Sequence, residues 1–523
     1  MPAVEPILVA GTWRPATAAA TFRAVEPSSG GKREAVWPVS DWSDVERALD
    51  AATVAARELA ATPGRRLAEF LERYAARLEA RAADLVSAAH AETGLPVKPR
   101  LADVEMPRTL DQLRQAAASA REGTWRMAMI DHAKNIRVAA LGLGPVVVFP
   151  PANFPFAYGA VTGGDFAAAI AAGNPVIAKA HPGHPTVSRL AAEEAVAALA
   201  DTGLPAATVQ LLHGLDPAVG ERLVADPRVG ATGFTGSQAA GEKLFRAASA
   251  AGRVIWVEMG SVNPVVLLPG ALAERGPAIA DELTASVTGS AGQFCTKPGV
   301  VFLVGDEAGR AFASTLAGTF AAIGPQVLLG PASCERLVAS LRGLEEAGAR
   351  ILAGVAGAAG PASHVPVLLE VSGRELLARP DAFIVEAFGN ATVLVVCASL
   401  EELERAVACV HGSLGASLYA ARTGGDDAAF ASVVRLLVER SGRVIENRMP
   451  TGLAVVPSMQ HGGPWPSAGP PFFSAVGFPW TMLRFARRVC FDGWMERRLP
   501  EIVRDAPPEG RPWRYVDHAW TRG

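Results

Sequence analysis

The chain has 523 residues, of which half are hydrophobic and 19% are charged. This usage is typical of a globular protein and excludes a long disordered chain, which needs low hydrophobicity and high net charge. The net charge of −3 provides no basic field for a phosphate backbone, so nucleic acid is not expected as a partner. The length predicts about three domains.

The cysteines are few, odd in number and without a CxxC pair: Cys295, Cys334, Cys397, Cys409 and Cys490. This set argues against a disulfide framework and favours a cytoplasmic protein with room for one reactive thiol. The N-terminal residues lack the pattern of a signal peptide. Prolines interrupt the uncharged stretch between Arg137 and Asp165, so no membrane span is expected.

The first part of the chain predicts mainly helices. After short extended pieces over residues 1–40, a helix is expected near Ser43, because Ser43 and Glu46 have the spacing of a capping box. A second helix follows Pro63 and ends at Thr93 and Gly94, where glycine supplies a C-cap. A third helix is expected over about 101–122.

Strands and helices alternate from residue 145 to residue 260. We expect strands at 146–149, 175–178, 209–212, 230–234 and 254–257, and helices at 156–172, 185–201, 216–225 and 237–250. This alternation indicates βαβ units and a parallel sheet, which binds ligands at the carboxyl ends of its strands. Residues 261–450 repeat an α/β pattern, and the Gly- and Pro-rich stretch 447–480 predicts an ordered surface loop.

Three residues are candidates for a catalytic centre. Cys295 ends a Gly-Gln-Phe-Cys run, and its thiolate would be a strong nucleophile with space for a substrate. Glu258 directly follows an apolar strand and suits a general base. Asn153, at a strand end between prolines, suits an oxyanion donor. Each also has an ordinary explanation: a buried thiol, a salt-bridged carboxylate and a turn asparagine.

The same sheet edge suits a ligand that carries phosphate. Gly236 allows close backbone approach between a strand and a helix, and a helix N-terminus favours phosphate, although the run is neither GxGxxG nor a P-loop. Lys179 ends a buried strand and is expected to reach a polar ligand. His181 and His184 are not expected to bind a metal, because prolines break the local helix and no third ligand is near.

The order of these features resembles the aldehyde dehydrogenase superfamily over nearly the whole chain. More narrowly, the chain is similar to the NADP-dependent branch that includes α-ketoglutarate semialdehyde (2,5-dioxovalerate) dehydrogenases and a fatty aldehyde dehydrogenase. The motifs are Ala91–Pro96, Asn153-Phe154-Pro155, Ala178–Pro182, Phe234-Thr235-Gly236-Ser237, Glu258–Pro264, Gly292–Thr296 and Glu386-Ala387-Phe388-Gly389.

The resemblance implies oxidation of an aldehyde to a carboxylic acid through a thioester on Cys295. Asn153 and the Cys295 amide would hold the oxyanion, and Glu258 would activate the hydrolytic water. NAD-preferring relatives have a glutamate three residues after the strand-end lysine, where this chain has Pro182, so we expect NADP to be preferred, with NAD also accepted. No metal is implied. The expected cofactor-binding residues are Lys179, His181, Gly214, Gly236, Ser237, Gly241, Glu386 and Phe388.

The implied fold is α/β and aldehyde dehydrogenase-like, with two Rossmann-like parallel-sheet domains and a small oligomerisation element. The cofactor-binding domain would comprise 1–123 and 145–260, and the catalytic domain 261–455. Residues 124–144 and 456–523 would form the oligomerisation and C-terminal segment. Because a lone β-hairpin is marginal, we expect a homo-oligomer, most often a dimer.

Alternatives remain open for both the substrate and the reaction. The expected substrate is a semialdehyde such as 2,5-dioxovalerate, and a fatty aldehyde or a CoA-linked semialdehyde is the second choice. Arg448 and Trp465 are candidates for the substrate funnel. A CoA-acylating reductase would lack Glu258, and a catalytically silent binding protein would lack at least one catalytic residue. The sequence departs from the branch at Asn390, at 150–152 and at 445–450.

Overall fold

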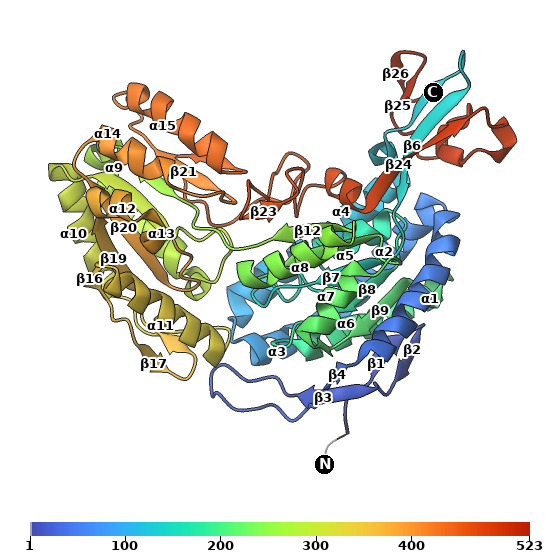
Figure 1. The fold of residues 1–523 in the computed structure, drawn as a ribbon, viewed down its shortest axis with the longest axis horizontal. Helices are drawn as coiled ribbons and strands as arrows, with labels where there is room; N and C mark the ends of the chain where they lie inside the picture. The colour runs from blue at the N-terminus through green and yellow to red at the C-terminus, as the bar shows by residue number, and fades with distance from the viewer. Residues whose placement is uncertain (1–2) are drawn as a thin grey trace.

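The computed structural model describes residues 3–523, and its first large sheet has eight strands (Figure 1). The central strands run parallel in the order β9-β8-β7-β11-β12, and antiparallel strands extend both edges. The bounds are β1 Ile7–Val9, β2 Thr12–Arg14, β7 Val146–Phe149, β8 Val176–Lys179, β9 Val209–Leu212, β11 Ala231–Thr235, β12 Val254–Glu258 and β23 Ala468–Gly469.

Helices cover both faces of this sheet (Figure 1). Side chains of a strand alternate between faces, so Val146 and Val148 pack among α2–α6 while Val147 packs against α1 and α7. Both faces are therefore apolar, which explains the continuous hydrophobic runs of the strands. The bounds are α1 Trp42–Ala60, α2 Gly64–Ala80, α3 Ala82–Thr93, α4 Met106–Glu122, α5 Gly164–Ala171, α6 Pro185–Thr202, α7 Pro217–Ala225 and α8 Gln238–Ala250.

The strand predictions for this sheet are confirmed to within one residue, but several helix boundaries differ. The N-cap of α1 is Asp41, whose carboxylate accepts hydrogen bonds from the amides of Ser43 and Asp44, so the expected Ser43 capping box is wrong. The helix expected after Pro63 is interrupted at Arg81, although Gly94 caps its end in the left-handed conformation. The third helix starts at Met106, after an irregular wide turn over Val97–Glu105.

The helix expected over 156–172 is confined to α5. The buried carboxylate of Glu105 accepts hydrogen bonds from the amides of Phe156 and Ala157, at 2.8 and 3.0 Å. Gly159 and Gly163 then make a tight turn in which a Cβ at Gly163 would lie 2.6 Å from the backbone of Tyr158. Tertiary contacts thus override the helix propensity of the alanine-rich sequence.

A second large sheet has seven strands in the order β16-β19-β20-β14-β13-β21-β22, all parallel except β16. Its strands are β13 Val265–Leu267, β14 Val300–Val304, β16 Arg350–Ala353, β19 Val367–Ser372, β20 Ala391–Cys397, β21 Ala416–Tyr419 and β22 Val444–Glu446. Its helices are α9 Pro269–Thr288, α10 Glu307–Ala321, α11 Pro331–Glu346, α12 Gly373–Ala378, α13 Pro380–Phe383, α14 Leu400–Ala408 and α15 Asp427–Arg440. The expected pair of parallel-sheet units is confirmed.

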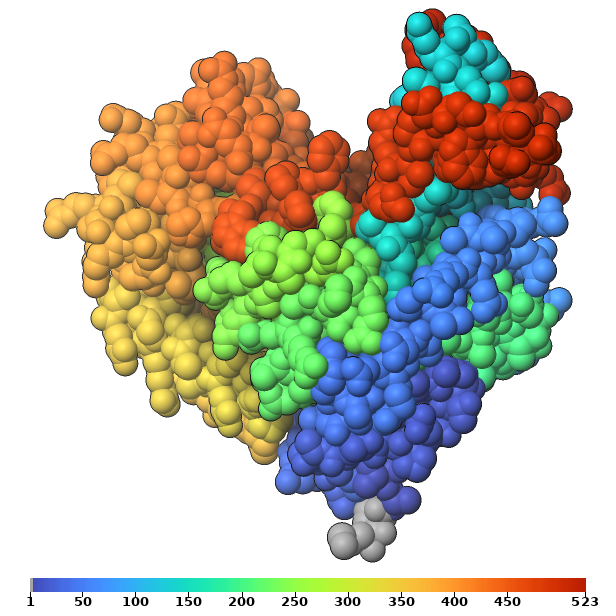
Figure 2. All heavy atoms as spheres, turned by 45° about the vertical axis from the view of Figure 1, so that its right-hand side comes forward, coloured from blue at the N-terminus to red at the C-terminus, as the bar shows by residue number. Residues whose placement is uncertain are grey.

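Three smaller sheets complete the fold. One joins β3 Ala18–Phe22, β4 Trp37–Ser40 and β10 Gly214–Leu215, and another joins β15 Gln326–Val327, β17 Ala358–Gly360 and β18 Ser363–His364. The third has five strands, in the order β24-β6-β5-β25-β26, and projects from the rest of the molecule (Figures 1 and 2). Its strands are β5 Met129–Asp131, β6 Ile136–Gly142, β24 Ala486–Asp492, β25 Arg514–Val516 and β26 Ala519–Thr521.

Within residues 3–523, no helix combines the length and the apolar composition that a bilayer crossing requires.

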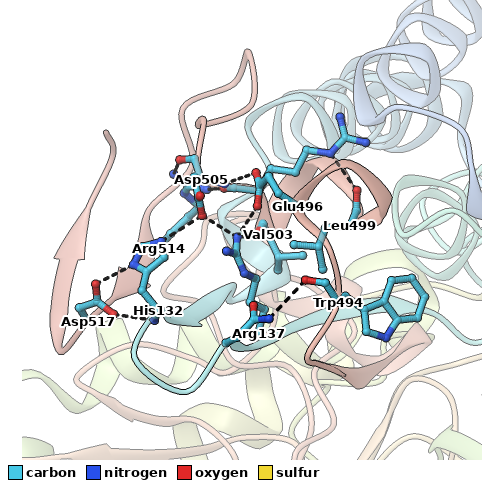
Figure 3. A network of polar contacts seen from close by, with 11 residues as sticks. His132, Arg137, Trp494, Glu496, Leu499, Val503, Asp505, Arg514 and Asp517 are labelled. Carbon is cyan, nitrogen blue, oxygen red and sulfur yellow. Dashed lines mark hydrogen bonds and ion pairs between the residues drawn. The ribbon is translucent and has the colours of Figure 1, made fainter.

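A polar network attaches the C-terminal segment to the β5–β6 hairpin (Figure 3). His132 contacts two carboxylates, with Nδ1 2.6 Å from Asp517 and Nε2 3.0 Å from Asp505. Arg137, a buried residue of β6, lies 2.7 Å from the same Asp505 carboxylate and 2.9 Å from that of Glu496. The network therefore joins the hairpin to three points of the tail.

This network predicts a pH-dependent attachment of the tail. The hydrogen bonds with Asp517 and Asp505 raise the pKa of His132, so its contribution is complete below about pH 6.5, the unfolded value, and is lost as the pH rises through the folded pKa. We expect proteolysis of the tail to be faster at pH 8.5 than at pH 6, by at most about fivefold because the pairs are exposed. His132→Gln should remove the difference. An equal pH effect in the variant would contradict this role.

Candidate active site

Cys295 lies in a turn between α9 and β14, after a left-handed stretch of backbone. Ser290, Ala291 and Gly292 have φ values of +51°, +54° and +68°. A Cβ at Gly292 would lie 2.1 Å from the carbonyl oxygen of Gly389, so glycine is required for the close approach of these two loops. The turn brings the Cys295 side chain against residues of the first sheet.

Glu258, His461 and Cys295 meet in one cluster. Glu258 ends β12, and its Oε1 lies 3.0 Å from Nε2 of His461. The same Nε2 lies 3.5 Å from the Cys295 Sγ, and the three groups lie within 4.8 Å of one another. Glu258 and His461 are both buried. With a hydrogen on Nε2, His461 donates to Glu258; without one, it accepts the thiol hydrogen.

The environment of Cys295 keeps its thiol protonated at rest. Burial raises the pKa of Cys295 well above its usual range, and the Glu258 carboxylate raises it further, while the charge of Arg108 opposes the rise. A thiol in this state needs a base within reach to become a nucleophile. His461 and Glu258 occupy that position.

Asn153 is held against the cysteine loop from two sides. Its Nδ2 donates to the carbonyl of Gln293 at 2.9 Å, two residues before Cys295. Its own carbonyl accepts from Nη2 of Arg100 at 2.8 Å, and Arg100 forms a buried ion pair with Glu105. The second Nδ2 hydrogen of Asn153 has no acceptor among residues 3–523.

Lys179 and His181 lie together at the end of β8, which is the predicted sheet edge. Lys179 is half-buried, and burial lowers its pKa to about 8. Burial and the neighbouring His184 lower the pKa of His181, and its Nδ1 accepts from the Gly183 amide at 3.0 Å. At neutral pH His181 therefore offers a hydrogen-bond donor at Nε2, whereas Lys179 offers the positive charge.

The predicted glycines differ in what surrounds them. Gly236 and Ser237 form the turn from β11 to α8, and Ser237 makes no side-chain cap, so the helix N-terminus is open to a ligand. A Cβ at Gly241 would lie 2.6 Å from the Met259 sulfur, so α8 packs closely on β12 through this residue. Gly214 pairs with β4, where a Cβ would lie 3.0 Å from Phe22; sheet packing accounts for this glycine.

Glu386 and Phe388 lie on the loop that contacts the cysteine turn. Oε1 of Glu386 accepts from the Ser261 amide at 3.1 Å, and Phe388 is half-buried. Lys297, two residues after Cys295, is buried and donates to the carbonyls of Ala387 and Ala391 at 3.1 and 2.7 Å. Burial lowers the pKa of Lys297 to about 8. This lysine fixes the Glu386 loop relative to the nucleophile.

Known proteins of one family resemble this chain over most of its length. The aldehyde dehydrogenase family model matches residues 13–460. The chain belongs to the aldehyde dehydrogenase family. It is 40% identical to alpha-ketoglutaric semialdehyde dehydrogenase 2 of Azospirillum brasilense, over 95% of this chain and 96% of that protein. It is 32% identical to alpha-ketoglutaric semialdehyde dehydrogenase of Acinetobacter baylyi, over 89% of each chain.

Solved structures show the same fold for this aldehyde dehydrogenase. A variant of aldehyde dehydrogenase C from Pseudomonas syringae, complexed with NAD+ and octanal, has a TM-score of 0.80 at 20% identity and covers 94% of this chain and 97% of its own. An NAD-dependent aldehyde dehydrogenase from Sinorhizobium meliloti has a TM-score of 0.80 at 21% identity, over 95% and 96% of the two chains. By its family match and its 40% identical relative, the chain is an oxidoreductase that acts on aldehydes.

Several residues of the aldehyde dehydrogenase site escaped the sequence analysis. His461 and Lys297 lie among the candidate catalytic residues, and Arg100, paired with Glu105, donates to the Asn153 carbonyl. In the sequence, the signal for His461 is the glycine pair that follows it. The structure explains this pair, because a Cβ at Gly462 would lie 2.2 Å from the carbonyl oxygen of Phe473. Such crowding identifies the 447–480 stretch as an interior-packed loop as well as a surface one.

The structure also places the two expected funnel residues and Asn390, one of the departures from the branch. Arg448 is exposed, and the ring of Trp465 lies 5.1 Å from that of Phe245 on α8. Asn390 donates from Nδ2 to the Gln326 side chain at 3.0 Å and to the His364 carbonyl at 2.9 Å, so it attaches the Glu386 loop to the paired strands β15 and β18.

Proposed function

We propose that this aldehyde dehydrogenase oxidises a short semialdehyde that carries a carboxylate, such as 2,5-dioxovalerate, with NADP preferred over NAD. The proposal for the reaction rests on one cluster, in which His461 contacts both Cys295 and Glu258. Asn153 is hydrogen-bonded to the same cysteine loop. The relatives named for this substrate, which match 89–95% of the chain, support the substrate.

Addition of Cys295 to the aldehyde would begin with removal of the thiol proton. His461 Nε2 accepts this proton and shares it with Glu258, and the Sγ atom forms a bond to the aldehyde carbon. The oxygen that becomes negative is held by Nδ2 of Asn153 and the amide of Cys295. These donors stabilise the tetrahedral adduct from which hydride is lost.

The residues at the sheet edge fit a nicotinamide dinucleotide. Lys179 has no carboxylate partner within the described part of the chain, and the α8 N-terminus is uncapped, so both favour phosphate groups. Glu386, fixed by Lys297, suits the nicotinamide ribose. The bound cofactor supplies the hydride acceptor. No carboxylate stands at Pro182 to repel a 2′-phosphate, and Lys179 with the Nε2 hydrogen of His181 would bind it.

Hydrolysis would then release the acid. With a thioester on Cys295, Glu258 accepts a proton from a water molecule as its oxygen attacks the acyl carbon. The carbon–sulfur bond breaks, and His461 returns a proton to the thiolate. Glu258 is thus the base for hydrolysis, and the proton that it takes from water then passes to solvent. In the first half it only accepts a hydrogen bond from the protonated His461, 3.0 Å away.

The direct test is formation of reduced cofactor by the purified enzyme with NADP and with NAD. The panel comprises 2,5-dioxovalerate, succinic semialdehyde, pentanal and octanal. We expect turnover with NADP to be fastest on the semialdehydes. Turnover restricted to octanal would replace the substrate proposal with a fatty aldehyde. Turnover that requires added CoA would replace hydrolysis with acyl transfer to CoA.

Cofactor preference is expected to depend on position 182. Pro182→Glu places a carboxylate near Lys179, where it would repel a 2′-phosphate and accept hydrogen bonds from ribose hydroxyls. We expect the NADP/NAD ratio of kcat/KM to fall about 10- to 100-fold. Pro182→Gln is the neutral control and should change the ratio little. If the glutamate variant keeps the original ratio, the phosphate is recognised elsewhere.

We also propose that the enzyme is a homodimer in the cytoplasm. β24 forms an edge of the projecting sheet and pairs only with β6 among residues 3–523, so its outer edge is available to a second copy. All five cysteines are free, as a reducing compartment requires. Gel filtration that gives a monomeric mass at working concentration would contradict the dimer.

A further inference from the structure

Arg108 projects from the first turn of α4 onto two aromatic side chains. Its guanidinium carbon lies 5.6 Å from the ring centre of Phe154 and 5.4 Å from that of Tyr158. Nε donates to Gln112 at 3.0 Å, and Nη2 lies 3.5 Å from the hydroxyl of Tyr158. These contacts fix the orientation of the guanidinium and use only part of its donors.

One layer of aromatic side chains separates Arg108 from the nucleophile. The Phe154 ring lies 5.8 Å from that of Phe294, the residue before Cys295. The Tyr158 ring lies 6.2 Å from that of His461, whose Nε2 is 3.5 Å from Sγ. The charge of Arg108 also acts on the thiol, because it opposes the rise in the pKa of Cys295.

Two other arginines near this cluster have hydrogen-bond partners of their own. Arg100 lies 4.4 Å from the Phe154 ring but forms an ion pair with Glu105. Arg443 donates to the carbonyls of Gly452 and Pro450. Among residues 3–523, Arg108 has no carboxylate partner. A half-buried guanidinium with unused donors is well suited to bind a carboxylate through two parallel hydrogen bonds.

We propose that Arg108 binds the carboxylate at the far end of the substrate while the aldehyde carbon reaches Cys295. The arginine would thereby select short anionic semialdehydes over neutral aldehydes of equal length. This inference rests on the proposed function and identifies the residue that determines its substrate class. The aromatic rings of Phe154 and Tyr158 would contact the carbon chain and hold the guanidinium in place.

The test compares Arg108→Met with wild type on 2,5-dioxovalerate and pentanal. In Arg108→Met we expect kcat/KM for 2,5-dioxovalerate, divided by kcat/KM for pentanal, to fall about 10- to 100-fold, because a hydrogen-bonded charge pair is lost. The loss should appear mainly in KM for the anionic substrate. Arg108→Lys should retain part of the preference, because it keeps the charge but not the planar fork.

The matched control is Arg114→Met on the same helix. Arg114 is paired with Glu79 at 2.6 Å on the exposed face of α4, so its substitution should leave the substrate ratio unchanged. Inhibition by glutarate gives an independent readout, and its inhibition constant should rise in Arg108→Met and in Arg108→Gln. An unchanged ratio and an unchanged inhibition constant would overturn the role of Arg108. Failure of wild type to oxidise any semialdehyde would instead overturn the proposed function.

Discussion

Replacing Cys295 with alanine is expected to lower kcat by at least about 10⁴-fold, because no other thiol or hydroxyl is proposed to form the acyl intermediate. The substitution removes one atom from a turn whose conformation is set by Gly292 and by two hydrogen bonds from Asn263 to the carbonyls of Cys295 and Lys297. Cofactor affinity should therefore be preserved, and fluorescence titration with NADPH measures it.

The control for this experiment is Cys409→Ala, a half-buried cysteine on the α14 side of the second sheet. It should retain wild-type turnover. Substantial activity in Cys295→Ala, with the same substrate profile, would mean that Cys295 is not the nucleophile. Loss of both activity and cofactor affinity would indicate a damaged fold, and a circular dichroism melt distinguishes the two cases.

Replacing Glu258 with glutamine is expected to slow turnover about 10²- to 10⁴-fold by removing the base for hydrolysis. The glutamine Oε1 can still accept from His461, so the geometry should remain. An acyl-enzyme should accumulate on Cys295 and appear as added mass by intact-protein mass spectrometry. A variant that turns over at the wild-type rate would assign hydrolysis to another base.

The same variant gives a second readout through the thiol. Burial is the first cause of the raised pKa of Cys295, and the charge of Glu258 is the second. Removing that charge should lower the pKa of Cys295. The rate of Cys295 alkylation by iodoacetamide should therefore begin to rise at a lower pH in Glu258→Gln than in wild type. His461→Asn provides the comparison: it should slow acylation itself, so no acyl-enzyme should accumulate. Accumulation in both variants would place His461 outside the first step.

The sequence by itself determined most of the first sheet and singled out three candidate catalytic residues. Strands such as Val146–Phe149 are short apolar runs between Gly and Pro, and both faces of the sheet are covered, so local pattern and burial agree. The roles expected of Cys295, Glu258 and Asn153 followed from the family resemblance, which short motifs in a fixed order carry. The left-handed cap at Gly94 was also predictable, because only local backbone geometry decides it.

Only the tertiary structure identified the partners of these residues. His461 is 203 residues from Glu258 and 166 from Cys295 along the chain. Arg108 contacts Phe154 and Tyr158, which are 46 and 50 residues further along. No periodicity or spacing relates such positions. The alanine-rich stretch at 156–172 shows the same limit, because Glu105, far earlier in the chain, binds its first amides. Local patterns specify elements and motifs, whereas a site built from distant loops is decided by how those elements pack.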